Sequence, residues 1–275
     1  MILKNQLCLK LRKNKLDGSR SCAAGEIVTI CLFFYHSKVR TFKDYYKIYI
    51  KDIYKSAFGK LVSYNRFVEL INENIAVLAL FAITIMAKAT GISYIDSTAL
   101  AVCNNRRIHS HKVLKRLAQR GKTSMGWFFG FKLHFVINDQ GEIIAFTITP
   151  GNVDDRDPGV IAKMTKELFG KLFGDRGYIS QKLFKDLFGC GIQLITRLKS
   201  NMKNILMPIE AKLLLRKRGI IESIINILKN QLQLEHTRHR STKGFFCNIF
   251  ACISAFAYYE SKPSLDIADN LITAA

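Results

Sequence analysis

The sequence predicts an α/β fold in which helices flank a mixed β-sheet and a small helical domain precedes it. Three observations predict this fold. Residues 1–88 read as helical, strand-like patterns begin at residue 91, and residues 211–234 form the clearest long amphipathic helix. With 275 residues, of which 49% are hydrophobic, the chain is long enough for a small domain followed by a medium-sized one.

The first 88 residues predict three helices in a basic segment. We expect helices over residues 26–36 and 41–56, and a third that begins at Ser63, a favoured N-cap residue. The segment carries 15 Lys and Arg against 6 Asp and Glu. Three short helices of this charge suit a DNA-binding unit of the helix-turn-helix kind. They equally suit a cap that only packs on the next domain, and the sequence leaves both interpretations open.

From residue 91 the pattern predicts strands. A first strand starts at residues 93–96, and residues 127–137 and 143–149 predict two more. The last two are separated by Asn-Asp-Gln-Gly at 138–141, which is a hairpin turn signal. We therefore expect an antiparallel hairpin early in the second domain.

Helices and strands alternate after this hairpin. Asp157 and Pro158 predict a helix start, with Asp as the N-cap and Pro at the first position. The remaining elements expected are a strand over 172–174, a helix over 180–188, a strand over 192–198 and the helix over 211–234. This order is three strands, a helix, a strand, a helix, a strand and a helix. It is typical of the ribonuclease-H-like fold.

Three acids stand where this fold would bring them together. Two-metal cleavage of a phosphodiester needs carboxylates from separate elements, and Mg²⁺ prefers oxygen ligands. Asp96 lies inside the first strand, Asp175 follows the fourth, and Glu222 lies on the last helix. An acid among apolar strand residues is costly unless it is paired or metal-bound. We therefore expect Asp96 to be a metal ligand, with Asp175 and Glu222 as candidates whose positions alone do not decide between a ligand and a structural role.

Each acid also has a simpler interpretation. Asp96 could bond the backbone at a strand end, and Asp175 could form a turn before Gly177. Glu222 could belong to an exposed ion-pair ladder, because Arg218 precedes it by one helical turn. Three further acids, Asp154, Asp155 and Asp157, cluster after the third predicted strand. We interpret Asp157 as an N-cap and the other two as loop or outer-layer acids.

The charge of the chain favours a polyanionic partner. It has 42 Lys and Arg against 21 Asp and Glu, a net charge of +21. Residues 102–124 hold no acid, so we expect phosphate contacts there rather than a merely solvated face. The predicted DNA-binding residues are Arg106, Arg107, Lys112, Lys115, Arg116, Arg120 and Lys122, with Arg218 and Lys229 around Glu222, and Arg238 and Arg240 after that helix.

Two classes of protein are disfavoured. The longest apolar stretch, residues 75–87, is shorter than the roughly 20 residues that span a bilayer, so we expect a buried helix there and a cytoplasmic protein without membrane partners. The seven cysteines include no Cys-x-x-Cys pair, so neither a disulfide framework nor a zinc site is indicated.

Several blocks of sequence resemble the DDE transposases of bacterial insertion sequences, most closely the insertion-sequence nine-eight-two family. The blocks include Gly-Asp-Arg-Gly-Tyr around Asp175 and Tyr-Ile-Asp-Ser-Thr around Asp96. They occupy residues 61–70, 91–98, 124–134, 149–156, 170–180, 214–223 and 235–241, in the family's order and spacing. A family signature of Tyr, two residues, Arg, three residues, Glu, six residues and Lys matches Arg218, Glu222 and Lys229, with Leu215 in place of Tyr.

The resemblance implies a ribonuclease-H-like catalytic domain, which we place at residues 89–260, and the sequence itself predicts a weakly structured tail over 261–275. The resemblance also implies cleavage at the ends of a mobile element, then joining of the freed 3′ end to target DNA. Asp96, Asp175 and Glu222 would hold Mg²⁺, for which Mn²⁺ could substitute. The implied partners are double-stranded DNA, as terminal repeats and target site, and a second copy of the chain. Two alternatives are an inactivated copy that only binds DNA and a general ribonuclease-H-type nuclease.

Overall fold

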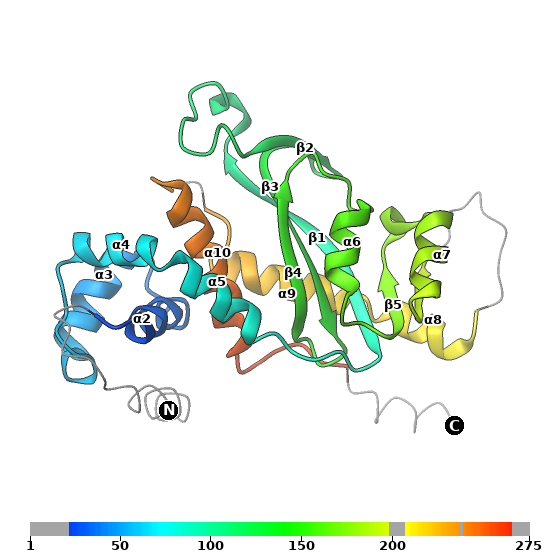
Figure 1. Cartoon of the computed structure of the whole chain (residues 1–275), viewed down its shortest axis with the longest axis horizontal. Helices are drawn as coiled ribbons and strands as arrows, with labels where there is room; N and C mark the ends of the chain where they lie inside the picture. The colour runs from blue at the N-terminus through cyan, green and yellow to red at the C-terminus, as the bar shows by residue number, and fades with distance from the viewer. Residues whose placement is uncertain (1–21, 198–206, 237–238, 266–275) are drawn as a thin grey trace. The chain divides into compact units, whose positions relative to one another are not determined.

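The computed structural model describes residues 22–197, 207–236 and 239–265 (Figure 1). The described residues form two compact units. The first comprises residues 22–85 together with 230–234 and 239–258, and the second comprises the rest. Of the predicted site residues, Arg238 lies outside the described residues, as does the end of the predicted tail from residue 266.

The first unit is helical throughout. Its helices are α2 (Ala24–His36), α3 (Phe42–Asp44), the π-helix η2 (Tyr45–Ile53), the short 3₁₀ turn η3 (Lys55–Ala57), α4 (Tyr64–Glu73), α5 (Ile75–Thr84) and α10 (Thr242–Ala257). The three predicted helical regions are confirmed. Ser63 caps α4, because its side chain accepts a hydrogen bond from the amide of Arg66. Helix α10, from the C-terminal part of the chain, packs against α2, α4 and α5.

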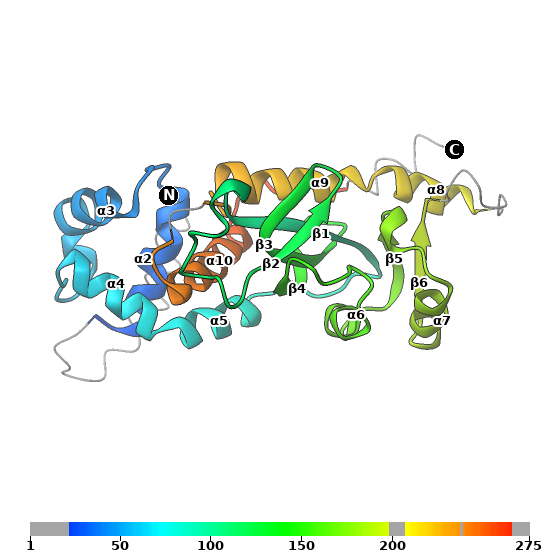
Figure 2. The ribbon, with the colours of Figure 1, turned by 90° about the horizontal axis from the view of Figure 1, so that it is seen from above.

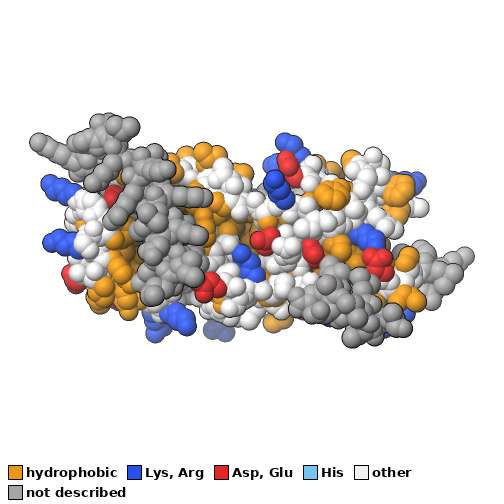
Figure 3. Space-filling view, turned by 90° about the horizontal axis from the view of Figure 1, so that it is seen from below, with side chains coloured by type: hydrophobic (Ala, Val, Ile, Leu, Met, Phe, Trp, Pro, Cys, Tyr) orange, Lys and Arg blue, Asp and Glu red, His pale blue; other side chains and the backbone are white. Residues whose placement is uncertain are grey.

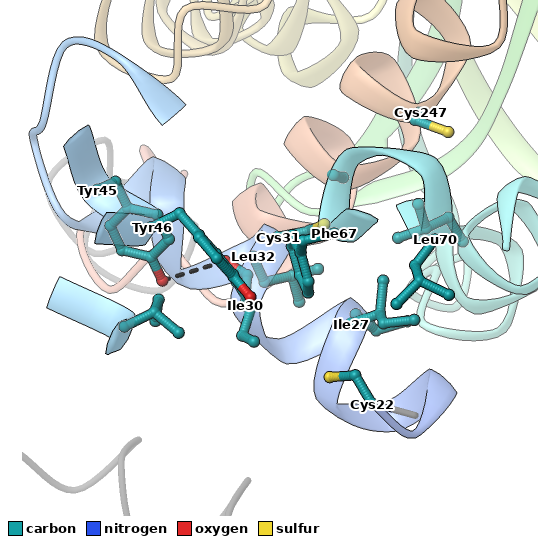
Figure 4. Close-up of a cluster of buried hydrophobic side chains, with 14 of the residues drawn as sticks. Cys22, Ile27, Ile30, Cys31, Leu32, Tyr45, Tyr46, Phe67, Leu70 and Cys247 are labelled. Carbon is teal, nitrogen blue, oxygen red and sulfur yellow. Dashed lines mark hydrogen bonds between the residues drawn. The ribbon is translucent and has the colours of Figure 1, made fainter. Parts of the chain in front are cut away.

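Aromatic and aliphatic side chains form the core of this unit. Tyr46 stacks on Phe67 with 4.5 Å between ring centroids, and both are fully buried. The buried hydroxyl of Tyr45 donates to the carbonyl of Ile30 at 3.1 Å, which joins η2 to α2 (Figure 4). Five of the six described cysteines are buried, and Cys247 of α10 lies in this same core. Burial gives these cysteines a packing role.

Helix α5 is not the buried helix that its composition predicts. Only Leu78 and Ala82 are buried, whereas Leu80 and Ile83 are more than 60% exposed. The prediction of a buried helix was wrong because a helix that is apolar on every face does not show which face its neighbours cover. No single described helix meets the length and composition of a membrane span, although α4 and α5 together pass that test as a pair bent by 61°.

The second unit is built on one mixed sheet. Strand β1 (Ile92–Cys103) pairs antiparallel with β3 (Gly126–Asn138), which pairs antiparallel with β4 (Ile143–Pro150). On the other side of β1 lie β5 (Gly170–Gly174) and β6 (Ile192–Thr196), both parallel to it. This arrangement is the ribonuclease-H-like order, so the predicted fold class is confirmed.

The predicted hairpin turn between β3 and β4 is also confirmed. The side-chain oxygen of Asn138 accepts hydrogen bonds from the amides of Gln140 and Glu142. Gly141 has a φ of +72°, a conformation that glycine adopts without strain. The sequence did not predict β2 (Gln119–Thr123), a mostly exposed polar strand that forms by pairing with the start of β3.

Helices cover both faces of the sheet (Figure 2). On one face lie α6 (Pro158–Thr165), which packs on β3 and β4, and α7 (Gln181–Gly189), which packs on β6. On the other lie α8 (Ile209–Arg216), which packs on β6, and α9 (Gly219–Asn226), which packs on β1. As predicted, Asp157 caps α6 through the amide of Val160.

The single helix predicted over residues 211–234 is divided. Helix α8 ends before Lys217, α9 begins at Gly219, and the chain continues as the π-helix η6 (Ile227–Gln231). Gly219 lies at the first break, and glycine costs about 1 kcal/mol relative to alanine inside a helix. The break places Arg218 between two helices and beside β1.

Candidate active site

The turn after β5 positions Asp175. Asp175 precedes the 3₁₀ turn η5 (Arg176–Tyr178), and its Oδ1 accepts a hydrogen bond of 2.7 Å from the amide of Gly177. A Cβ on Gly177 would lie only 2.8 Å from that oxygen. Asp175 therefore has the predicted turn-forming role. Glycine at position 177 leaves room for the carboxylate of Asp175 to approach the backbone there.

Gly174 makes room for a different side chain of the same turn. A Cβ on Gly174 would lie 3.2–3.3 Å from the Cβ and ring carbons of Tyr178. The ring of Tyr178 therefore packs directly on the last residue of β5, and Tyr178 is 2% exposed. The Gly-Asp-Arg-Gly-Tyr block thus presents a carboxylate and buries a phenol at the end of β5.

Asp96 lies on the strand next to Asp175. In the parallel pairing of β1 with β5, Ser93 is level with Leu172 and Tyr94 with Phe173. Asp96 lies two residues beyond Tyr94 on β1, and Asp175 lies two residues beyond Phe173, directly after β5 ends at Gly174. The two predicted acids thus come from neighbouring strands, as the strand order predicted.

Burial dominates the electrostatics of Asp96. It raises the pKa of this carboxyl from 3.8 to about 6, and the negative charges of Asp175 and Asp155 add to the rise. The guanidinium of Arg218 and the amide of Ser97, which donates to Oδ1 at 2.8 Å, oppose it. A carboxyl with a raised pKa beside further acids is a candidate functional group, because this environment favours a bound cation.

Arg218 joins Asp96 to Glu222. Its Nη2 lies 2.5 Å from Asp96 Oδ2, and its Nη1 lies 3.6 Å from Glu222 Oε1. The side chains of Arg218 and Asp96 are 16% and 17% exposed, whereas that of Glu222 is 68% exposed. The three predicted acids are therefore not equivalent, because Glu222 faces solvent and reaches Asp96 only through Arg218.

Asp155, which we expected to be a loop or outer-layer acid, lies in the same region. Its Oδ1 accepts hydrogen bonds from the hydroxyl of Ser97 at 2.8 Å and the ammonium of Lys132 at 3.1 Å. Nδ1 of the buried His134 lies 3.7 Å away. By contrast, Asp154 pairs with Arg156 at the surface. The carboxylate of Asp155 is thus fixed on Ser97, the neighbour of Asp96.

Lys229 is also engaged within the protein. Its ammonium donates to the carbonyl of Ala99 at 2.6 Å and lies 2.8 Å from Glu235 Oε2. Glu235 in turn accepts from the amide of Ala101. Lys229 and Arg218 thus both join the segment that contains α9 to β1.

The basic segment between β1 and β3 has a different character. It includes the 3₁₀ turn η4 (Asn105–Arg107) and β2, and its chain projects beyond the sheet in Figure 1. All seven predicted cations between Arg106 and Lys122 are exposed, and none forms an ion pair within the described part of the chain. Lys122 lies 5.7 Å from the ring of Trp127. The face seen in Figure 3 carries both basic and acidic side chains. Arg240, in the first unit, is exposed as well.

Comparison with known proteins decides the family. The family described as "Transposase DDE domain" matches residues 86–242, which is more than half of the chain and includes all three predicted acids. The chain belongs to the DDE transposases. No curated protein matches it. Among solved structures, a piggyBac transposase synaptic complex with hairpin DNA is similar with a TM-score of 0.49 and 11% identity, over 98% of this chain and 75% of that one.

DDE transposases generally use divalent metal ions, which are bound by oxygen-rich side chains. Asp96, Asp155 and Asp175 offer the hard oxygen ligands that Mg²⁺ prefers. In addition to burial, the charges of Asp175 and Asp155 raise the pKa of Asp96, and all three carboxylates raise the pKa of the Tyr178 phenol. Among the residues that the structure describes, no three His, Cys, Asp or Glu lie close enough to hold an ion as they stand. The donors therefore fit a metal by their chemistry, although their present spacing forms no such group among the described residues.

Two functional candidates of the transposase, Lys132 and Tyr178, were not considered from the sequence. Asp155 was interpreted as a loop or outer-layer acid, but its partners Ser97 and Lys132 were not predicted. Lys132 binds Asp155 from β3, where it alternates with apolar residues in the Gly-Phe-Lys-Leu-His block. A cation at a mostly buried strand position is the signal that could have identified it, since buried charges are paired.

Proposed function

We propose that this transposase cuts double-stranded DNA at the ends of an insertion sequence of the nine-eight-two type and joins the 3′ end to target DNA. Asp96, Asp175 and Glu222 would hold Mg²⁺, or Mn²⁺ in its place. The observation that carries the proposal is that Asp96 and Asp175 each lie two residues beyond a paired level of the neighbouring parallel strands β1 and β5. The raised pKa of Asp96 supports it, because a bound cation would stabilise the ionised form.

The residues of the site have separable tasks in this proposal. Bound metal would activate the attacking water or hydroxyl and stabilise charge on the phosphate. Asp96 is a ligand on β1 and Asp175 a ligand in the turn after β5, whereas Glu222 is an exposed ligand on α9. Arg218 balances the charge of Asp96 and holds Glu222 near it. Lys132 and Ser97 fix Asp155 behind Asp96.

DNA would be held by the basic segment, whose seven exposed cations have no acidic partners within the described residues. Arg240 and Arg238 would add contacts. Arg218 and Lys229 would contact phosphate only by exchanging their present partners, Asp96 and Glu235. The helical first segment would recognise the ends of the element, because it combines a helical core with an excess of cations. The complex would contain two copies of the chain, which the mass of the protein–DNA complex would test.

The experiment uses DNA that carries the terminal repeats flanking the gene. With Mg²⁺ or Mn²⁺, we expect cleavage at the repeat, none on a scrambled duplex, and none after chelation with EDTA. Binding without cleavage in either metal would instead support an inactivated copy. Faster cleavage of an RNA–DNA hybrid than of the repeat would support a general nuclease.

A further inference from the structure

Tyr178 carries a buried hydroxyl without a hydrogen-bond partner. The residue is 2% exposed, and its hydroxyl is unpartnered within the described residues. An unpaired buried hydroxyl opposes folding, because it gives up hydrogen bonds to water without replacing them. Phenylalanine would fill the same space without that cost. Packing on Gly174 therefore explains the ring of Tyr178 but not its hydroxyl.

The surroundings of the hydroxyl indicate its role. The amide of Tyr178 donates to the carbonyl of Asp175 at 3.2 Å, which fixes Tyr178 in the turn that carries this acid. Burial raises the pKa of the phenol well above its usual value, the charges of Asp96, Asp155 and Asp175 add to the rise, and Arg218 opposes it. Two of these acids, Asp96 and Asp175, are proposed metal ligands, and Asp155 is held by Ser97 next to Asp96. A neutral phenol can donate a hydrogen bond to any of these carboxylates or to a water bound near them.

We propose that Tyr178 is a positioning residue of the metal site, whose hydroxyl donates to a carboxylate oxygen or a water molecule that is placed only when a divalent ion binds. The inference rests on the proposed function. Hydrogen bonds from outer residues orient metal ligands, and their loss typically weakens metal binding by about 10- to 100-fold. Tyr178 would thus be unpaired without metal and paired with it.

Tyr94 provides a matched control on the neighbouring strand. It is also fully buried, and its ring stacks on Phe173 at 5.2 Å between centroids. Unlike Tyr178, it has a partner, because its hydroxyl donates to the carbonyl of Leu214 at 3.1 Å. Removing one hydroxyl from each site compares a paired phenol with an unpaired one.

The experiment measures thermal unfolding without metal and Mn²⁺ affinity by electron paramagnetic resonance, on the full chain. We expect Tyr178→Phe to unfold at the same temperature as wild type or higher, and to bind Mn²⁺ roughly tenfold more weakly. Tyr94→Phe should unfold at a lower temperature and bind Mn²⁺ within about twofold of wild type, since the hydroxyl it loses serves only the fold.

Two results would overturn the assignment. One is an unchanged Mn²⁺ affinity in Tyr178→Phe while Asp96→Asn binds Mn²⁺ weakly. The other is a loss of metal-free stability in Tyr178→Phe as large as that in Tyr94→Phe, which would show a structural partner for the hydroxyl. If Asp96→Asn also binds Mn²⁺ like wild type, the metal site itself is misplaced, and the proposed function fails together with this inference.

Discussion

The guanidinium of Arg218 lies against the carboxylate of Asp96, with 2.5 Å between Nη2 and Oδ2. Arg218 stands at the break between α8 and α9, and Asp96 lies on β1. The contact therefore ties the helix that carries Glu222 to the strand that carries Asp96. Because both side chains are largely buried, each charge depends on the other for compensation.

Arg218→Ala should destabilise the metal-free protein by about 3 kcal/mol, because breaking a buried pair leaves one charge uncompensated. Urea unfolding measures this change in the free energy of unfolding. The control is Arg66→Ala, which removes the ion pairs of Arg66 with Glu69 and Glu73, all of them about half exposed or more. It should cost less than about 1 kcal/mol. Equal losses in the two variants would show that the Arg218–Asp96 pair is no stronger than a surface pair.

The stability of the metal-free protein should depend on pH through Asp96. Its pKa is raised in the folded state from 3.8 to about 6, so between these values the folded protein binds more protons than the unfolded chain. The free energy of unfolding therefore falls as pH rises across this window, by roughly 3 kcal/mol at most. Asp96→Asn removes this dependence and leaves a constant offset from the altered contact with Arg218.

Unfolding in urea at pH 4, 5, 6 and 7 tests the dependence. The stability of Asp96→Asn minus that of wild type should increase with pH up to about pH 6 and then level off. A difference that stays constant, or that decreases with pH, would contradict the raised pKa. Chelation throughout keeps adventitious metal from lowering the pKa.

Gly177→Ala should weaken metal binding through Asp175. The new Cβ would lie 2.8 Å from Asp175 Oδ1, so the carboxylate must shift. We expect Mn²⁺ affinity to fall by about tenfold. Gly189→Ala is the control, because no atom lies within 4 Å of its added Cβ at the end of α7. The Gly189→Ala variant should keep the wild-type Mn²⁺ affinity. Similar Mn²⁺ affinities in the two variants would show that the contact between Gly177 and Asp175 does not matter for metal binding.

Replacing Arg106, Arg107, Lys115 and Arg116 with alanine should weaken DNA binding and reduce its salt dependence by roughly 0.9 log–log units per lost phosphate contact. The matched control replaces Lys163, Lys166, Lys182 and Lys185, which are exposed on and after α6 and on α7. It removes the same charge from the total of +21. Fluorescence of Trp127, the only tryptophan, reports binding beside Lys122. Equal salt slopes in both variants would show that only net charge matters.

The sequence predicted those parts of the fold that local signals determine. Ser63 and Asp157 cap helices, and the 138–141 turn forms its hairpin, because each signal acts over a few residues. The polar strand β2 was missed, because its structure comes from pairing with β3 rather than from its own composition. The break at Gly219 was missed because the apolar periodicity continues across it.

The site was predictable where strand order alone positions a residue. Asp96 and Asp175 follow from the order of β1 and β5, whatever their side chains do. The contacts of Asp155 with Ser97 and Lys132 join residues 58 and 23 positions apart, and no local pattern indicates them. The hydroxyl of Tyr178 was equally hidden, because a buried Tyr next to a strand normally indicates only core packing.

Cleavage by Asp96→Asn tests the central claim most directly. The substitution keeps the size of the side chain and removes the charge proposed to hold the metal. We expect strand cleavage in Mg²⁺ to fall by several orders of magnitude, because the metal supplies both activation and charge stabilisation, while DNA binding is retained. Asp154→Asn, which changes a surface acid paired with Arg156, should cut like wild type. Cleavage by Asp96→Asn at the wild-type rate would contradict the assignment of the site.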